Sequence, residues 1–188
     1  MKATQPSGSL NPISGCYIDI NDLGVTIPMY ILPDISDSKS VSYPDENGIG
    51  RSMPFKSFQN SENRSISWTA HFLVTTGKTN GGSANGVSIE DLIIWLRAIE
   101  ACTYPQSKNT NGAPYAPPPV CKLKCGRLIS EEKEVCAVMK NYSVKFDPSV
   151  PWDEDSFMPY KLDVDMSFDV VYNQSDLPGS DTIMESGY

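Results

Sequence analysis

The sequence has little histidine and no long apolar run. His71 is the only histidine, so a hydrolase that depends on histidine would have to use it. No Gly-x-Ser-x-Gly motif supplies a nucleophile. We therefore expect no catalytic residues and no cofactor. Because no stretch of about eighteen apolar residues occurs, we expect no membrane-spanning helix. The first residues lack the apolar core of a secretory signal, which predicts synthesis in the cytoplasm.

Basic residues are also scarce. The chain has 15 Lys and Arg against 23 Asp and Glu, which gives a net charge of −8 over 188 residues. General binding to nucleic acid draws its affinity from clustered cations on phosphates. The composition therefore argues against specific or general nucleic-acid binding, although nucleic acid could pass by the protein without adhering.

Cysteines are too few and odd in number for a disulfide-stapled framework. The five are Cys16, Cys102, Cys121, Cys125 and Cys136. We expect reduced thiols in the core. A zinc site remains an alternative, but on a strand the sulfurs of Cys121 and Cys125 would lie roughly 13 Å apart. A disulfide formed in an oxidising environment is the other alternative.

The most informative segment is residues 160–172, YKLDVDMSFDVVY. Its alternation has the period of a β-strand, so one face is apolar and is expected to be buried. The opposite face carries Asp163, Asp165 and Asp169, which we expect to face water, a wet channel or a seam between subunits. A strand of this length is also expected to bend at a bulge or to extend beyond a compact barrel.

Five further stretches have the pattern of strands. They are residues 16–20, 25–32, 66–74 and a hairpin of 120–129 with 135–146. In the last strand, the alternation predicts one apolar face made of Cys136, Val138, Tyr142, Val144 and Phe146. Pro28 restricts the second strand to a sheet edge or a bend. The fold class is therefore mainly β, an antiparallel β-barrel or a two-sheet sandwich.

One amphipathic helix is predicted at about residues 88–102. Ser88 is a good N-cap, and acidic residues follow it in the first turn. Apolar residues recur at helical spacing, and we expect Ile89, Leu92, Ile93 and Leu96 to dock the helix on the sheet. Trp95 borders this stripe and either completes the buried face or projects toward a neighbour.

The remaining segments predict loops around a single domain spanning residues 1–188. Residues 1–15 resemble a flexible N-terminal arm, and residues 173–188 an acidic, disordered tail. Residues 33–58 are rich in Ser, Pro, Asp and Gly, which predicts a long loop of the kind that is usually functional or interfacial.

Several segments together resemble a known family. The strings DISDSK (34–39), GRSMP (50–54) and SENRSISW (61–68) look like the N-terminal half of tail-tube initiator proteins from the baseplates of contractile-tailed bacteriophages. In the second half, a Pro-rich connector leads into VCKLKCG (120–126), a strand near 138–146 and a closing strand near 160–172. The resemblance rests on pattern and segment order over most of residues 16–172.

This resemblance implies a structural protein of the virion tail, at the baseplate or tube junction. It implies a homo-oligomeric ring of six copies between the baseplate hub and the tail tube, with DNA passing through the lumen. On that expectation, Asp163, Asp165 and Asp169 would help to make an acidic lumen that repels phosphate.

Other functions fit parts of the pattern. The chain could be the tail-tube protein itself or a hub adaptor. In a different class, a small carbohydrate-binding β-sandwich could use Trp68, Trp95 and Trp152 as a platform for a sugar ring.

Overall fold

The computed structural model describes residues 11–47, 49–50, 52–75, 86–106, 116–129 and 134–172. The predicted C-terminal tail and most of the predicted N-terminal arm lie outside them. The main strands are β1 (Cys16–Ile20), β2 (Val25–Pro28), β3 (Asp34–Ser38), β8 (Ser65–Leu73), β9 (Cys121–Cys125), β10 (Val135–Phe146) and β11 (Lys161–Val170). Four two-residue strands are β4 (Val41–Ser42), β5 (Asp45–Glu46), β6 (Phe55–Lys56) and β7 (Asn60–Ser61). The helices are α1 (Ile89–Ala101), α2 (Gly126–Ile129) and a 3-10 turn (Asn21–Leu23).

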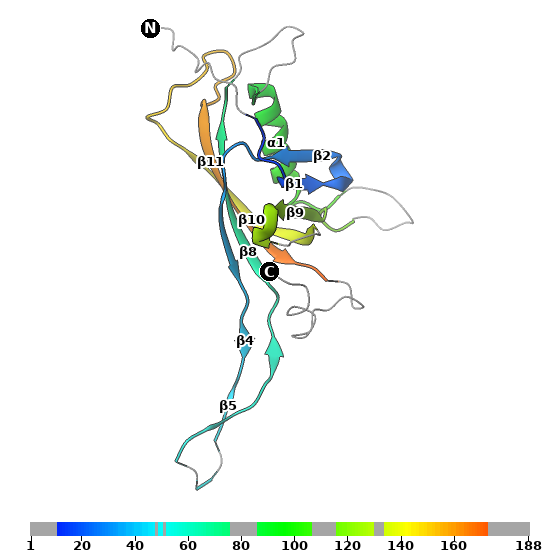
Figure 1. Cartoon of the computed structure of the whole chain (residues 1–188), viewed down its shortest axis with the longest axis vertical. Helices are drawn as coiled ribbons and strands as arrows, with labels where there is room; N and C mark the ends of the chain where they lie inside the picture. Colours follow the sequence, from blue (N-terminus) through cyan, green and yellow to red (C-terminus); the bar gives the residue numbers. More distant parts are fainter. Residues whose placement is uncertain are drawn as a thin grey trace.

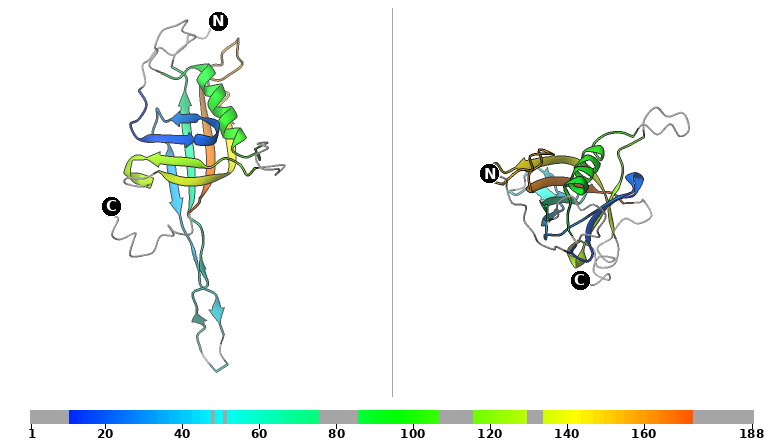
Figure 2. Two further views of the ribbon diagram at one scale, coloured as in Figure 1. Left: turned by 90° about the vertical axis from the view of Figure 1, so that its right-hand side faces the viewer. Right: turned by 90° about the horizontal axis from the view of Figure 1, so that it is seen from above.

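One antiparallel sheet of seven strands forms the body, in the order β2-β1-β9-β10-β11-β8-β3. Strands β1, β2 and β9 cross over the long strands β8 and β11, and α1 lies beside them (Figures 1 and 2). The sheet folds over on itself but does not close, because β2 and β3 remain its edges among the described residues. The mainly β fold with one flanking helix is confirmed, and the closed barrel is not formed.

The core lies between the two folded parts of this sheet. Strands β8 and β11 pair in register, with Val164 opposite Ala70 and Met166 opposite Trp68. The inward side chains of both strands are 0–3% exposed: Ile66, Trp68, Ala70, Phe72, Leu162, Val164, Met166, Phe168 and Val170. Burying each large apolar side chain contributes roughly 1.5–3 kcal/mol. The apolar faces predicted for the strands at residues 66–74 and 160–172 are therefore the buried faces of β8 and β11.

The predicted apolar face of β10 is wrong in its first half. Ala137 and Met139 are buried there, whereas Cys136 is exposed. The pairing with β11 shifts between Met139 and Asn141, so Lys140 is an extra residue in a β-bulge. A bulge shifts the alternation by one residue. Cys136 is consequently a surface thiol and does not belong to the core.

The predicted long loop at residues 33–58 is also wrong. Its first part is the edge strand β3, which pairs with β8 from Asp34 to Ser38. The rest belongs to a segment that we call the projecting hairpin (residues 39–64), in which β4 pairs with β7 and β5 with β6. This hairpin extends well away from the body of the protein (Figure 1). These strands were not recognised in the sequence, because a two-stranded hairpin with no buried face does not show an alternation of apolar and polar residues. Its many Ser, Asp and Pro residues are typical of a loop.

Helix α1 begins and packs largely as predicted. Ser88 is the N-cap, and its hydroxyl and the Asp91 carboxylate form a reciprocal capping box. Leu92 is fully buried, and Trp95, Ala98 and Ile99 complete the buried face. Trp95 packs against the ring of Phe72, with centroids 5.7 Å apart, which fastens the helix to β8. The described part of the chain contains no helix long and apolar enough to cross a membrane.

Candidate functional site

The outer face of β11 carries the three predicted aspartates. Asp163, Asp165 and Asp169 alternate with the buried side chains of the strand and are each about one-third exposed, with side-chain exposures of 33%, 34% and 28%. They point away from the core, as the alternation requires. The face is bounded by the outward residues of β8 on one side and β10 on the other.

Each aspartate has a partner on a neighbouring strand. The Asp165 carboxylate accepts a hydrogen bond from the Thr69 hydroxyl at 2.7 Å and lies 2.6 Å from Lys145 Nζ. Asp169 lies 3.3 Å from the ammonium group of Lys140, the bulge residue of β10. The surface is therefore a network of paired charges rather than a row of isolated carboxylates. These partners come from 20 or more residues away, and the sequence pattern gave no sign of them.

His71 belongs to the same face. Its Nδ1 is 2.7 Å from an oxygen of Asp163, and its Nε2 is 3.4 Å from an oxygen of Asp34 on the edge strand β3. The imidazole therefore bridges β11, β8 and β3. Within the described residues its polar contacts are these two carboxylates, so no hydroxyl or thiol nucleophile adjoins it. This arrangement suits a cross-strand structural contact.

Lys145 stabilises the charged form of Asp165. The hydrogen bond from Lys145, followed by that from Thr69, lowers the pKa of the Asp165 carboxyl below its ordinary value of 3.8. The same contact raises the pKa of Lys145. A carboxyl group whose pKa is lowered on folding stabilises the folded state above its ordinary pKa, and this stabilisation is lost as pH falls through the folded-state pKa.

We expect Asp165→Asn to weaken the dependence of the free energy of unfolding on pH in the acidic range. The stability lost by wild type between pH 5 and pH 2 should exceed the loss in the variant, since only wild type must protonate a paired carboxylate. Urea unfolding at a series of pH values measures this difference. Lys145→Gln, which keeps the carboxylate but removes its main partner, should weaken this dependence as well. Equal pH dependence in all three proteins would contradict the assigned pairing.

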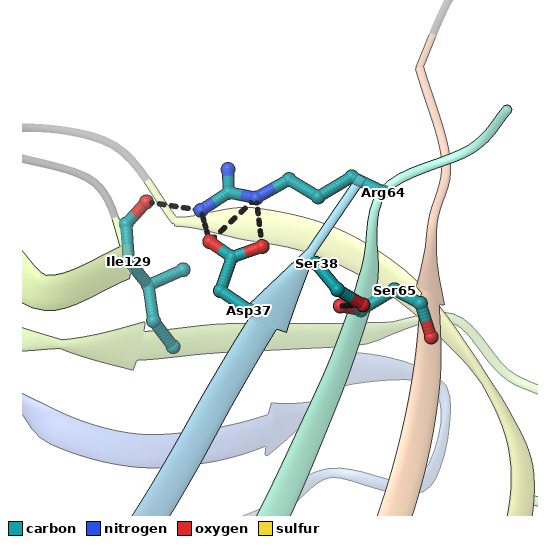
Figure 3. Close-up of polar contacts among 5 residues, drawn as sticks. All are labelled: Asp37, Ser38, Arg64, Ser65 and Ile129. Atoms are coloured by element: carbon teal, nitrogen blue, oxygen red, sulfur yellow. Dashed lines mark hydrogen bonds and ion pairs between the residues drawn. The ribbon is translucent and has the colours of Figure 1, made fainter. Parts of the chain in front are cut away.

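The base of the projecting hairpin is fixed by polar contacts. The Arg64 guanidinium donates to Asp37 from Nε at 2.9 Å and also from Nη2, and Nη2 donates to the Ile129 carbonyl at 3.1 Å (Figure 3). The Ser38 hydroxyl donates to the Ser65 carbonyl beside them. The hydrogen bond to Asp37 raises the pKa of Arg64. The hairpin therefore leaves the body in a defined direction.

Beyond this base, the projecting hairpin exposes large apolar side chains. Ile49 is 108% exposed, Met53 79% and Phe58 64%. The Phe58 ring forms an edge-type contact with the ring of Tyr43, with centroids 6.0 Å apart. Exposed apolar groups gathered on one element typically mark an interaction surface.

The predicted helix-docking residues fall into two groups, one at the core and one on the flank of α1. Leu92 is buried in the core, and Ile89 and Leu96 pack against it while remaining partly exposed. Ile93 lies on the flank of α1, where it and Leu96 line a shallow groove against β10. The other lining residues are Arg97, Glu100, Tyr142, Val144, Phe146 and Met158. The helix is thus rotated slightly from the expected stripe, because Trp95 lies on its buried face.

The cysteines do not converge on one point. Cys121 lies 3.7 Å from Cys102, and Cys125 lies 2.9 Å from Cys16, measured between the sulfur atoms. The described residues contain no group of three or more His, Cys, Asp or Glu side chains placed to hold a metal ion. Four thiols are buried, as expected for reduced core residues, and Cys136 is the exception.

The tryptophans do not form a sugar-binding platform. Trp68 and Trp95 are buried at 0% and 8% exposure, and Trp152 is separately placed on the surface against Phe146. With two of the three rings in the core, stacking of all three on a carbohydrate is excluded.

Comparison with known proteins adds no relative: neither a protein-family model nor a curated protein matches the chain.

Proposed function

We propose that this chain is a structural subunit of a contractile bacteriophage tail. In this proposal about six copies form a ring that joins the baseplate hub to the tail tube and nucleates tube assembly, and DNA passes through the lumen. The chain has no catalytic role. The support consists of the segment resemblance described above and of the surfaces that the fold presents for assembly.

The projecting hairpin is the observation that carries the proposal. A two-stranded ribbon alone in water is marginally stable at best, because it has no core of its own. Here the ribbon lies away from the body and exposes Ile49, Met53 and Phe58. Such a segment is stabilised when a partner covers its apolar side chains. A neighbouring subunit of an assembly is the partner that the proposal assigns to it.

The sheet edges and the charged face support the same function. Within the described residues β3 is an edge strand of the sheet, beside the hairpin, and such edges can extend a sheet into a neighbouring subunit. In the proposed ring the face of Asp163, Asp165 and Asp169 lies toward the lumen or a subunit seam. The net charge of −8 would disfavour adhesion of the passing phosphate backbone.

Substitution in the projecting hairpin tests the proposal. The double variant Met53→Ser, Phe58→Ser removes apolar contact area from a surface that is solvent-exposed in the single chain. We expect unchanged circular dichroism but a large loss of higher-order species in size-exclusion chromatography with light scattering, because buried apolar anchors dominate association. Leu32→Ser is the matched control, since Leu32 is 58% exposed but lies outside the hairpin.

Two outcomes would contradict the proposed role of the hairpin. One is an oligomer that survives the double variant unchanged. The other is equal loss of the oligomer in the Leu32→Ser control, which would place the contact outside the hairpin.

A further inference from the structure

Cys16 and Cys125 form a cross-strand pair with the geometry of a disulfide site. Cys16 is the first residue of β1 and Cys125 the last residue of β9, and they lie directly opposite each other in the antiparallel register. Their sulfur atoms are 2.9 Å apart. The two residues are 109 positions apart in the sequence, so only the fold brings them together.

The backbone hydrogen bonds show which kind of antiparallel pair this is. Next to it, the Gly126 N–H donates to the carbonyl of Gly15, the residue opposite. On the other side of β1, the Cys16 carbonyl accepts from the Met29 N–H. The Cys16 N–H donates to the Ile13 carbonyl, so neither backbone group of Cys16 bonds to Cys125, and the two cysteines are a non-hydrogen-bonded pair. Such pairs have Cα atoms about 4.5 Å apart, which is within the range for disulfides.

We propose that Cys16 and Cys125 are a disulfide-forming site, which a soluble small-molecule disulfide oxidises to fasten the N-terminal hairpin β1-β2 to β9. In the first step one cysteine thiolate attacks the oxidant, forming a mixed disulfide and releasing one small thiol. In the second, the other cysteine thiolate attacks the protein sulfur of that mixed disulfide and releases the second small thiol. The protein loses two thiol hydrogens, and the oxidant is reduced to two thiols. This inference does not depend on the proposed tail function.

The folded environment sets the conditions for this reaction. Cys16 and Cys125 are 1% and 3% exposed, and burial, followed by the contact with Cys125, raises the pKa of the Cys16 thiol. Since the thiolate is the nucleophile, the buried thiols of the fully folded protein react slowly with a disulfide oxidant. Both residues lie at strand ends, and β1 is held by β9 and the edge strand β2. We expect the hairpin β1-β2 at this end of the sheet to open at a lower cost than global unfolding, which would expose both thiols.

The other thiols provide internal comparisons. Cys102 and Cys121 are also buried, but they join the end of α1 to β9 without a strand register and lie 3.7 Å apart. Cys136 is exposed and has no cysteine partner in the described residues. The Cys136 thiol therefore reports whether an oxidant has reacted at all.

Mass spectrometry of the full chain tests the site. The protein is incubated with oxidised glutathione at a urea concentration just below the unfolding transition, and free thiols are then blocked before proteolysis under non-reducing conditions. We expect a peptide pair linked through Cys16 and Cys125, with a mass about 2 Da below the sum of its reduced peptides. Cys136→Ala should retain this link. In Cys16→Ala the link should be absent, and Cys125 should form a glutathione adduct or remain a thiol.

Oxidation should also raise the thermal midpoint of the wild-type chain, because the bond closes a long loop. The expected increase is roughly 5–15 °C, reversed by dithiothreitol. A Cys136 glutathione adduct together with unlinked Cys16 and Cys125 would overturn the proposal. A disulfide that joins Cys125 to a different cysteine would overturn it as well. Because the link is mapped in wild type, poor folding of the alanine variant would not affect the test.

Discussion

Val164→Asp is expected to unfold the protein. Val164 is 0% exposed, at the centre of β11 between Ala70 on β8 and Val144 on β10. An aspartate at this position would place a carboxylate among apolar side chains with no partner. Such burial costs several kcal/mol, which is comparable with the whole stability of an ordinary domain, about 5–15 kcal/mol. Loss of the cooperative thermal transition, followed by circular dichroism, measures the effect.

The outward positions of the same strand supply the controls. Ser167→Asp introduces the same side chain three residues farther along β11, on the outer face between Ser67 and Asn141. The triple replacement of Asp163, Asp165 and Asp169 by asparagine removes the charges already there. Both proteins should remain folded, because partly solvated ion pairs contribute little to stability. A folded Val164→Asp protein together with an unfolded Ser167→Asp protein would show that the two faces are exchanged.

The second large effect is expected from Leu92→Ala on α1. Leu92 is 0% exposed and sits where the helix meets the core. Truncation leaves a cavity that the packed surroundings fill only in part, so the free energy of unfolding should fall by about 2–5 kcal/mol. Ile94→Ala is the matched control, because Ile94 is 52% exposed on the same helix. An unchanged urea midpoint for Leu92→Ala would contradict the assigned helix face.

The sequence predicted the elements whose side chains divide cleanly between core and solvent. β8 and β11 have one apolar and one polar face, and this period of two identifies both the strand and its orientation. Helix α1 has a capping box at Ser88 and an apolar stripe. The stripe predicted Leu92 correctly but assigned Trp95 only to its border. Sequence spacing alone did not show that the Trp95 ring belongs to the buried face of the helix.

Features that depend on long-range pairing could not be predicted in this way. The bulge at Lys140 has no local signature, yet it moves Cys136 to the surface. The projecting hairpin has no buried face, so its sequence lacks the alternation of apolar and polar residues and resembled a loop. The pairing of His71 with Asp163, and of Cys16 with Cys125, depends on strand order and register. Neither is encoded in the spacing of a single segment.

We propose that this chain is a ring subunit of a contractile tail, and an electron cryo-microscopy reconstruction of a tail that contains the chain would test this. We expect about six copies around the tail axis between hub and tube, with the projecting hairpin packed on a neighbouring subunit and the face of Asp163, Asp165 and Asp169 at the lumen or a subunit seam. A single copy at the tail tip, or a ring whose hairpins extend into solvent without contacting a neighbour, would contradict the account.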